Sequence, residues 1–154
     1  MNDQLAELYG NRVRVRVCGL CWDEGKLLLI NHRLVTETRF WSPPGGGVEF
    51  EERLESALER EFLEETGLQI QAGNFLFGCE FIHAPLHAIE LFFSVTRTGG
   101  KLVAGHDPEL QLIREASFIG YDDILRMPQG ETHGVFRLAP TREDLDQLSG
   151  FYRI

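Results

Sequence analysis

The sequence feature that most constrains the fold is an acidic segment with helical spacing that follows a run of prolines and glycines. Residues 43–47 read Pro-Pro-Gly-Gly-Gly, a run that interrupts regular structure. Residues 53–66 contain good helix formers at helical spacing, and Gly67 is placed to end the helix. With about 100° between successive residues, Leu58 and Phe62 share a face that we expect to pack on a sheet.

The same helix face also carries carboxylates. Glu61 and Glu65 fall within the apolar stripe, Glu64 lies at its margin, and Glu55 and Glu59 lie nearer the solvent side. Desolvating an unpaired carboxylate costs several kcal/mol, and packed carboxylates also repel one another. The pattern indicates either a cleft in which divalent cations neutralise this end of the helix, or a solvated acidic helix end.

The charge of the chain is concentrated in the same region. Fifteen lysines and arginines against 24 acids give a net charge of −9 over 154 residues. Residues 49–65 alone contribute −6 through two arginines and eight glutamates, Glu49, Glu51, Glu52, Glu55, Glu59, Glu61, Glu64 and Glu65. Such a surface repels anions, so we expect no binding of duplex nucleic acid and no association with an anionic membrane.

The composition predicts one globular domain, residues 1–154. Hydrophobic residues make up 43% of the chain and charged residues 25%, as in ordinary globular proteins. No apolar run approaches the ~20 residues of a membrane helix, and the first residues show no secretory signal. Three cysteines, an odd number, favour a reducing compartment, so we expect a cytoplasmic protein.

The remaining pattern predicts an α/β (α+β) domain, in which strands are more numerous than helices and the helices pack on a sheet. The alternation in residues 12–17 places Val13, Val15 and Val17 inward. Arg12, Arg14 and Arg16 share the other face, where they could balance the acidic substrate site, although we expect them to be solvated. We expect a hairpin turn at residues 98–101. Further strands are expected at residues 26–32, 40–42, 68–71, 75–83, 87–97 and 116–121, and helices at residues 3–9, 122–126 and 141–148.

The glycine run and the acidic helix together indicate phosphate chemistry. A glycine-rich turn allows the backbone to approach a ligand closely, and its carbonyl groups can bind a metal ion. Carboxylate and carbonyl oxygens suit Mg²⁺ or Mn²⁺. Because Mg²⁺ held by few carboxylates usually also binds substrate phosphates, these residues favour metal-assisted phosphoryl transfer to water.

The motif resembles the signature of the Nudix hydrolase family. Gly46, Glu52 and the run from Arg60 to Leu68 fit the pattern G-x5-E-x7-R-E-U-x-E-E-x-G-U at nine positions over 23 residues. Phe62 stands where the family usually has a smaller aliphatic residue. The resemblance implies a Nudix-type α/β/α sandwich around a central mixed sheet.

The resemblance also implies an activity and the residues that perform it. Family members hydrolyse the diphosphate of a nucleoside diphosphate linked to another group, X. Arg60 would orient the catalytic Glu61 by a charge-assisted hydrogen bond. The expected ligands of the Mg²⁺ or Mn²⁺ cofactor are Glu61, Glu64 and Glu65, with assistance from Glu52 and the Gly45 carbonyl.

Further residues are candidates for catalysis and substrate binding. Glu61 is the first choice as general base, and Glu109 on a later loop is the second, ahead of Glu115. Arg33 and Arg39 flank the glycine run and could reach substrate phosphates, which Gly46 would allow to approach. We expect a small nucleotide diphosphate as partner, and the chain could also pair with a second copy as a homodimer.

Two other functions are considered. A catalytically idle nucleotide-binding or regulatory module on the same fold would be expected to lack some of the carboxylates, but all four are present. An isomerase of prenyl diphosphates would depart from the full motif and use a dedicated cysteine and glutamate. The motif is complete here and contains no cysteine, which favours the hydrolase.

Overall fold

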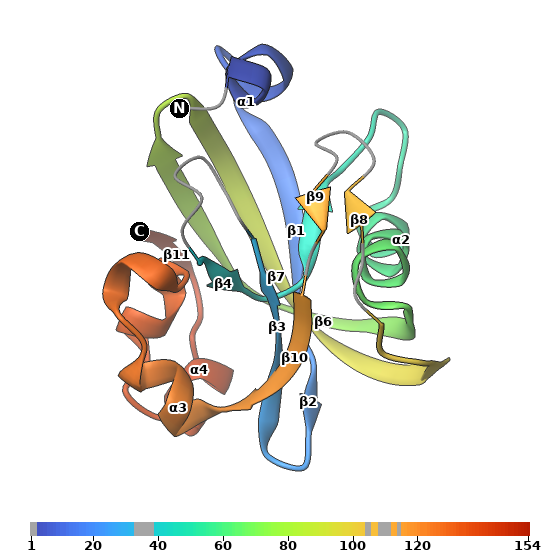
Figure 1. Ribbon diagram of the computed structural model, residues 1–154, viewed down its shortest axis with the longest axis vertical. Coiled ribbons are helices and arrows are strands. Elements are labelled where there is room, and N and C mark those ends of the chain that lie inside the picture. The colour runs from blue at the N-terminus through green and yellow to red at the C-terminus, as the bar shows by residue number, and fades with distance from the viewer. Residues whose placement is uncertain (1–2, 33–38, 104–105, 108–111, 114) are drawn as a thin grey trace.

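The computed structural model describes residues 3–32, 39–103, 106–107, 112–113 and 115–154. Figure 1 shows helix α2 on one side of the strands and helices α3 and α4 on the other. The helices are α1 (Asp3–Tyr9), α2 (Leu54–Thr66), α3 (Tyr121–Arg126) and α4 (Arg142–Asp146), with 3-10 turns η1 (Gln129–Glu131) and η2 (Gly134–Leu138). The strands are β1 (Arg14–Leu20), β2 (Trp22–Asp23), β3 (Lys26–Asn31), β4 (Trp41–Ser42), β5 (Gly45–Gly47), β6 (Leu68–His83), β7 (Leu86–Gly100), β8 (His106–Asp107), β9 (Leu112–Ile113), β10 (Glu115–Gly120) and β11 (Phe151–Arg153).

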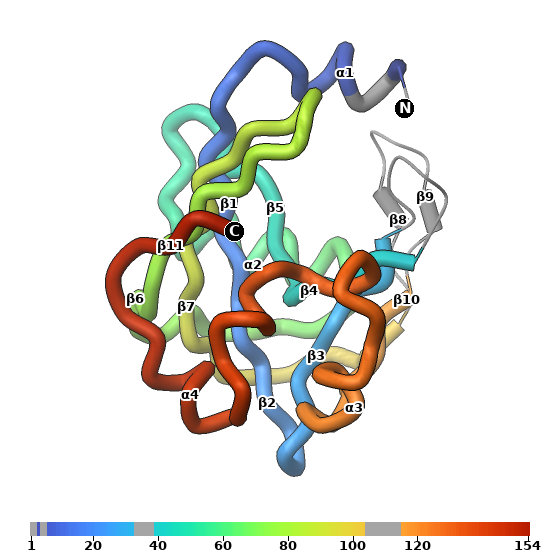
Figure 2. Tube along the Cα trace, turned by 90° about the vertical axis from the view of Figure 1, so that its left-hand side faces the viewer, coloured from blue at the N-terminus to red at the C-terminus, as the bar shows by residue number. Residues whose placement is uncertain are grey.

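The main sheet is mixed and has the strand order β11-β6-β7-β1-β5. Strand β1 pairs parallel to β7 and antiparallel to β5, so it lies between the long β6–β7 hairpin and the glycine run. A second sheet has the order β10-β3-β2, with β4 also paired to β3. Figure 2 shows β3 and β10 beside this main sheet and the C-terminal segment crossing its lower part. The mixed sheet confirms the predicted fold class.

Two apolar clusters lie on opposite faces of the strands. One lies beneath α2 and includes Val17, Leu58 and Phe62, all of them fully buried. The other lies beneath α3, η2 and α4 and is built around Phe77 and Phe92, whose rings stack at 4.6 Å. The central strands therefore bury side chains against helices on both sides, which gives the sandwich its three layers.

Helix α2 has the predicted orientation and ends at Thr66 as predicted, but it begins at Leu54, one residue later than expected. Gly67 ends it in the left-handed conformation, with φ of 76°, and its N–H donates to the carbonyl of Leu63. Ala57, Leu58 and Phe62 are buried, whereas Glu55 and Glu59 are exposed. At α4, the Thr141 side chain accepts a hydrogen bond from the backbone N–H of Asp144 and so caps the helix.

The expectation that Val13 and Val15 point into the core is wrong. They are 57% and 44% exposed, and only Val17 of the three is buried. The strand begins at Arg14 and extends past α2, so the covering layer reaches Val17 but not the two valines before it. On the other face, Arg16 is not solvated as expected, because its guanidinium contacts the buried Glu90.

The expected turn at residues 98–101 is also absent, because β7 continues to Gly100. Gly99 pairs with Gln69 and Gly100 with Leu68, at the start of β6. Gly100 has φ of 80°, and a Cβ there would overlap the Gly67 carbonyl oxygen. These glycines therefore allow close strand approach instead of forming a turn.

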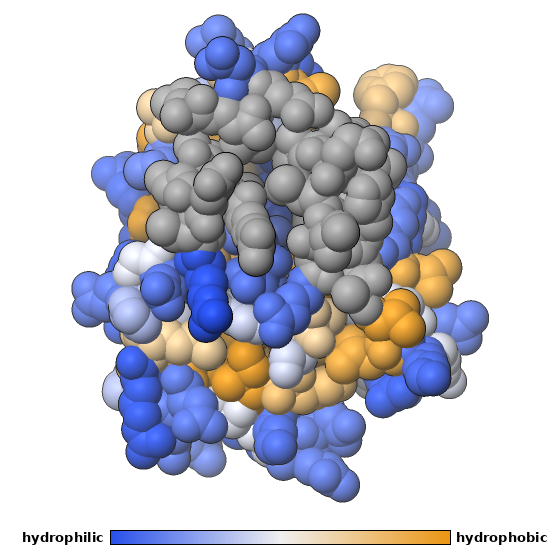
Figure 3. Space-filling model, in the orientation of Figure 1, coloured by the Kyte–Doolittle hydropathy of each residue, from blue (hydrophilic) through white to orange (hydrophobic). Residues whose placement is uncertain are grey.

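Among the described residues, no helix has the length and the apolar character needed to cross a membrane. Among the coloured residues of Figure 3, most are hydrophilic, and apolar residues gather in a band across the lower half of the view.

Replacing Phe62 with alanine should lower the free energy of unfolding by about 3–5 kcal/mol, because its ring is fully buried between α2 and β1. Urea denaturation of the purified protein measures this change. Leu63→Ala is the matched control on the same helix, since Leu63 is 53% exposed, and it should cost under about 1 kcal/mol. Equal losses in both variants would contradict the packing of α2 described here.

Candidate functional site: a carboxylate cluster on α2

Arg60 joins three glutamates of the motif into one cluster. Its Nε and Nη2 donate to the two carboxylate oxygens of Glu52 at 2.8 and 2.9 Å. Its Nη1 donates to Glu61 at 2.9 Å and to Glu64 at 3.4 Å. Nη2 also donates to the Gly47 carbonyl at 3.1 Å, which ties the helix to β5. The predicted hydrogen bond from Arg60 to Glu61 is present, and Glu52 takes the bidentate position.

Glycine is required at two positions of β5 because atoms of neighbouring elements lie where a side chain would begin. A Cβ on Gly46 would overlap the Glu61 carboxylate, and a Cβ on Gly45 would overlap the carbonyl oxygen of Val17 on β1. Gly46 pairs with Val17 and Gly45 with Cys18 in the antiparallel register. Because neither glycine has a side chain, α2 and β1 both lie directly against the backbone of β5.

The carboxylates of α2 are buried to different degrees, as the helical spacing predicts. Glu65 is 4% exposed, the Glu61 side chain is 14% exposed, and the Glu64 side chain is 45% exposed. Burial raises the pKa of Glu61; the Arg60 guanidinium lowers that pKa and Glu64 raises it further. Hydrogen bonds from Arg60 lower the pKa of Glu52. The cluster therefore combines a carboxyl group of raised pKa, on Glu61, with one of lowered pKa, on Glu52.

The donor set of the cluster suits a hard cation such as Mg²⁺. All the candidate ligands are carboxylate or carbonyl oxygens, with no histidine or thiol among them. Within the described residues, no group of three or more His, Cys, Asp and Glu side chains converges as a ready-made metal site. Mg²⁺ commonly uses only one or two carboxylates and completes its shell with water and substrate phosphates, so these residues fit it chemically.

A second polar network lies on the other face of β1 and is not predicted from the sequence. Glu90 of β7 is 2% exposed and accepts hydrogen bonds from Arg16 at 2.5 Å and from His133 at 2.7 Å. The backbone N–H of Val135 donates to Nδ1 of His133, so the ring hydrogen belongs on Nε2, facing Glu90. The only sequence signal for this network is the single acid within the apolar run 88–93.

The buried network is coupled to the cluster by charge. Burial acts to raise the pKa of Glu90, but His133 and Arg16 outweigh it and lower that pKa to about 2. Burial acts to lower the pKa of Arg16, whereas Glu90, Cys18, Glu65 and Glu61 raise it above its ordinary value. Arg16 therefore lies within the electrostatic field of both Glu90 and the carboxylates of α2.

The remaining candidates are not part of the cluster as described. Arg33 and Glu109 lie outside the described residues. Arg39 is exposed just before β4. Glu115 is exposed at the start of β10 and accepts a hydrogen bond from Asn31 at 3.4 Å. The structure therefore brings together Glu52, Arg60, Glu61, Glu64, Gly46 and Gly47.

Comparison with known proteins agrees with this geometry. The sequence pattern of the NUDIX domain matches residues 10–138. An ADP-ribose pyrophosphatase of Methanocaldococcus jannaschii is 30% identical over 115 residues, which cover 73% of this chain and 65% of that protein. The chain thus spans about two thirds of the length of this relative.

Solved structures share the fold. A MutT NUDIX hydrolase from Burkholderia pseudomallei superposes with a TM-score of 0.66 and 26% identity, over 90% of this chain and 99% of that one. A MutT protein from Methanosarcina mazei Go1 gives a TM-score of 0.60 and 26% identity, over 75% and 83% of the two chains. An ADP-ribose pyrophosphatase from Streptococcus suis has the same fold, with a TM-score of 0.62, 18% identity and coverage of 90% and 98%.

The chain belongs to the Nudix family, because the domain pattern covers most of its length. This membership confirms the family that the motif of residues 46–68 predicts.

Replacing Gly46 with alanine should destabilise the protein by about 1–3 kcal/mol, because the new methyl group would displace the Glu61 carboxylate. Gly130→Ala is the matched control, since a Cβ there meets nothing within 4 Å. Thermal unfolding of both variants measures the difference. A Gly46→Ala protein as stable as the control would show that Glu61 does not lie against β5.

The Glu90 network should make stability fall in acid. A carboxyl group whose folded pKa is lowered stabilises the protein above its ordinary value of 4.5, and this contribution disappears as pH falls toward about 2. Urea unfolding from pH 5 downward should therefore show a smaller pH dependence in Glu90→Gln than in the parent. Glu143→Gln, at an exposed position on α4, should retain the parental pH dependence. An unchanged slope in Glu90→Gln would contradict this assignment.

Proposed function

We propose that the protein is a metal-dependent pyrophosphohydrolase. It would cleave the diphosphate of a nucleoside diphosphate linked to another moiety X, through attack of water at phosphorus. The observation that carries the proposal is the cluster in which Arg60 binds Glu52, Glu61 and Glu64 beside the buried Glu65. A core of acids held by a single arginine is costly unless the site binds cations.

The proposed roles follow from position. Glu61, Glu64 and Glu65 would hold Mg²⁺ or Mn²⁺, with Glu52 and the Gly45 carbonyl as further ligands. A bound divalent cation neutralises the diphosphate and polarises its phosphoryl oxygens. Arg60 keeps Glu52 and Glu61 in fixed orientations through hydrogen bonds of 2.8–2.9 Å. Gly46 lets the Glu61 carboxylate lie against the backbone of β5, and this glycine is proposed to contact the substrate.

The reaction requires a base. The oxygen of water forms a bond to phosphorus, the anhydride P–O bond breaks, and a carboxylate takes the proton of the water. The products are a nucleoside monophosphate and the phosphorylated X group. Glu61 is our first choice as base, because its side chain is 14% exposed and lies against β5 at the end of the cluster. Glu109 is the alternative, with Glu115 after it, and Arg33 and Arg39 are proposed to bind substrate phosphates.

ADP-ribose is the first substrate to test. The Methanocaldococcus jannaschii relative is named an ADP-ribose pyrophosphatase, and the match covers 65% of its length. Nucleotide sugars and nucleoside triphosphates contain the same anhydride bond and belong in the same screen, with release of monophosphate product as the readout.

Glu65→Gln should abolish hydrolysis at saturating Mg²⁺ while the protein keeps its fold. Amide replacement removes the charge of a 4% exposed side chain but preserves its shape. Glu59→Gln removes one charge from the exposed side of the same helix and should retain parental kcat/KM. Steady-state turnover at increasing Mg²⁺ concentration measures both variants, with thermal unfolding as the check on folding.

The outcomes separate the proposed enzyme from an idle binding module. Retained turnover in Glu65→Gln would remove Glu65 from the proposed metal ligands. A parent protein that binds nucleotides but hydrolyses none of the screened substrates would favour the idle module.

A further inference from the structure

Arg16 is the most exposed member of the buried network between β1 and β7. The side chains of Glu90 and His133 are 2% and 5% exposed, whereas the Arg16 side chain is 24% exposed. Its Nη1 atom donates to Glu90, but Nε and Nη2 have no hydrogen-bond partner among the described residues. Because polar groups in a protein interior are normally paired, these two nitrogens are donors for a ligand.

The network holds the guanidinium in one orientation. Glu90 accepts from Arg16 through Oε2 and from His133 through Oε1, at 2.5 and 2.7 Å. The His133 ring is itself fixed, because its Nδ1 accepts from the backbone N–H of Val135 at 3.0 Å. Both oxygens of the carboxylate are therefore occupied, and the other two nitrogens of Arg16 keep a set direction before any ligand binds.

The carboxylate cluster lies at the free edge of the main sheet. Strand β5 is the last in the order β11-β6-β7-β1-β5, and the N–H of Val48, just after β5, donates to the carbonyl of Val15 on β1 at 3.0 Å. Successive residues of a strand direct their backbone groups to opposite edges, so the carbonyl groups of Gly45 and Gly47 point away from β1. Arg60 binds the Gly47 carbonyl there, at 3.1 Å. A ligand at this edge therefore lies beside both faces of β5, only one of which packs on α2.

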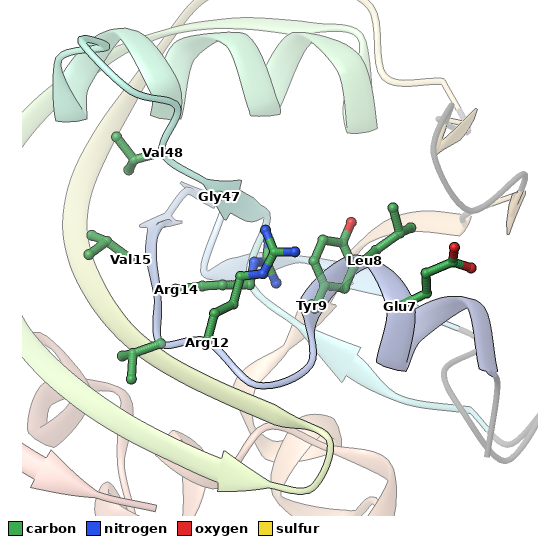
Figure 4. A pocket seen from close by; sticks show the side chains of 9 residues that line it. Glu7, Leu8, Tyr9, Arg12, Arg14, Val15, Gly47 and Val48 are labelled. Carbon is green, nitrogen blue, oxygen red and sulfur yellow. The ribbon is translucent and has the colours of Figure 1, made fainter.

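Arg16 lies near the same edge, on the face away from α2. Figure 4 shows Val15 on one side of β1 and Arg14 on the other, and alternation puts Arg16 on the side of Arg14. Arg16 is paired with Gly47 and is therefore the diagonal neighbour of Gly45. Diagonal neighbours are about 7–8 Å apart, within reach of a long side chain, and Gly45 places no side chain between Arg16 and the edge.

The charges of Arg16 and of the cluster act on each other. Burial and Glu90 have the largest effects on the pKa of Arg16, and Glu65 and Glu61 raise that pKa further. Burial and Arg60 have the largest effects on the pKa of Glu61, which Arg16 also lowers. Because Coulomb energies fall with distance and with screening, such mutual effects place the guanidinium near the acids of α2.

A phosphate oxygen is the acceptor that these observations favour. Guanidinium N–H groups match the geometry of phosphate oxygens, and a hydrogen bond between them is charge-assisted. The proposed diphosphate binds at the acids of α2 through a divalent cation, and Arg16 approaches that position from the other face of β5. The diphosphate would thus be held between a cation on one face and a guanidinium on the other.

We propose that Arg16 binds an oxygen of the substrate diphosphate through Nε or Nη2. Glu90 and His133 act as positioning residues, because they are buried and fix the guanidinium that contacts the substrate. The inference rests on the proposed function for the identity of the substrate. It adds to the motif of residues 46–68 a substrate-binding residue from β1.

Calorimetry with two ligands that resist hydrolysis tests this contact in the presence of Mg²⁺. The ligand α,β-methylene ADP contains a diphosphate analogue and a nucleoside, whereas methylenediphosphonate contains the diphosphate analogue alone. Arg16→Lys should weaken the binding of both ligands by about tenfold, because lysine keeps the charge beside Glu90 but lacks the planar set of N–H groups. If Arg16 only neutralised Glu90, lysine would replace it without loss of affinity.

Arg126→Lys is the matched control. Arg126 also belongs to an ion pair, with Asp123 at 3.3 Å, but it is exposed on α3. The same substitution at this position should leave the affinities for both ligands at the parental values.

A second variant decides the test if Arg16→Lys fails to fold, which thermal unfolding detects. The double variant Arg16→Gln with Glu90→Gln removes both charges of the ion pair together, so neither charge is left buried and unpaired. It should show the same loss of affinity for both ligands.

Each outcome either supports or overturns the contact. Parental affinity for both ligands in the folded Arg16 variants overturns it. A loss confined to α,β-methylene ADP also overturns it, because Arg16 would then bind the nucleoside. A parent that binds neither ligand contradicts this inference and the proposed function together. A parent that hydrolyses no substrate, but whose Arg16 variants lose affinity for both ligands, supports the contact and contradicts the proposed hydrolysis.

Discussion

The interaction on which the rest of the site depends is the set of hydrogen bonds from Arg60. One guanidinium contacts the carboxylates of Glu52, Glu61 and Glu64 and also the carbonyl of Gly47. Without the positive charge of Arg60, acids one helical turn apart would repel one another, and α2 would lose this hydrogen bond to β5. Because the same group binds both side chains and backbone, it links the orientation of the carboxylates to the position of β5.

The two faces of strand β1 contact different environments. Toward α2, its Val17 joins the apolar cluster that supports the helix, and the glycines of β5 let the backbone lie against Glu61. On the opposite face, Arg16 contacts Glu90 beside the aromatic cluster beneath α3 and α4. The positive charge of Arg16 and the acids of α2 thus lie on opposite faces of the same strand. A single strand supplies the apolar support and part of the compensating charge.

Much of this could be predicted from the sequence because the signals are local. The spacing of Leu58, Phe62 and Glu65 fixes one face of a helix, and Gly67 ends it, so α2 follows from positions close in the chain. The Arg16–Glu90 contact could not be predicted, because it depends on the pairing of strands 74 residues apart. The exposure of Val13 depends on how far α2 extends over the sheet, which an alternating pattern does not contain. The glycines at 99 and 100 were misleading because close strand pairing and turns favour the same residue.

The ion pair between β1 and β7 favours one alignment of these two strands over shifted alignments. Arg16 lies opposite Glu90 in the parallel register, with valines on either side of it in the sequence. A shift of one residue would turn a valine toward the buried carboxylate and leave the guanidinium on the wrong face. An uncompensated charge in the interior is far more costly than a poorly packed methyl group. The pair therefore acts against misaligned states, and one buried contact fixes the register of β1 against β7.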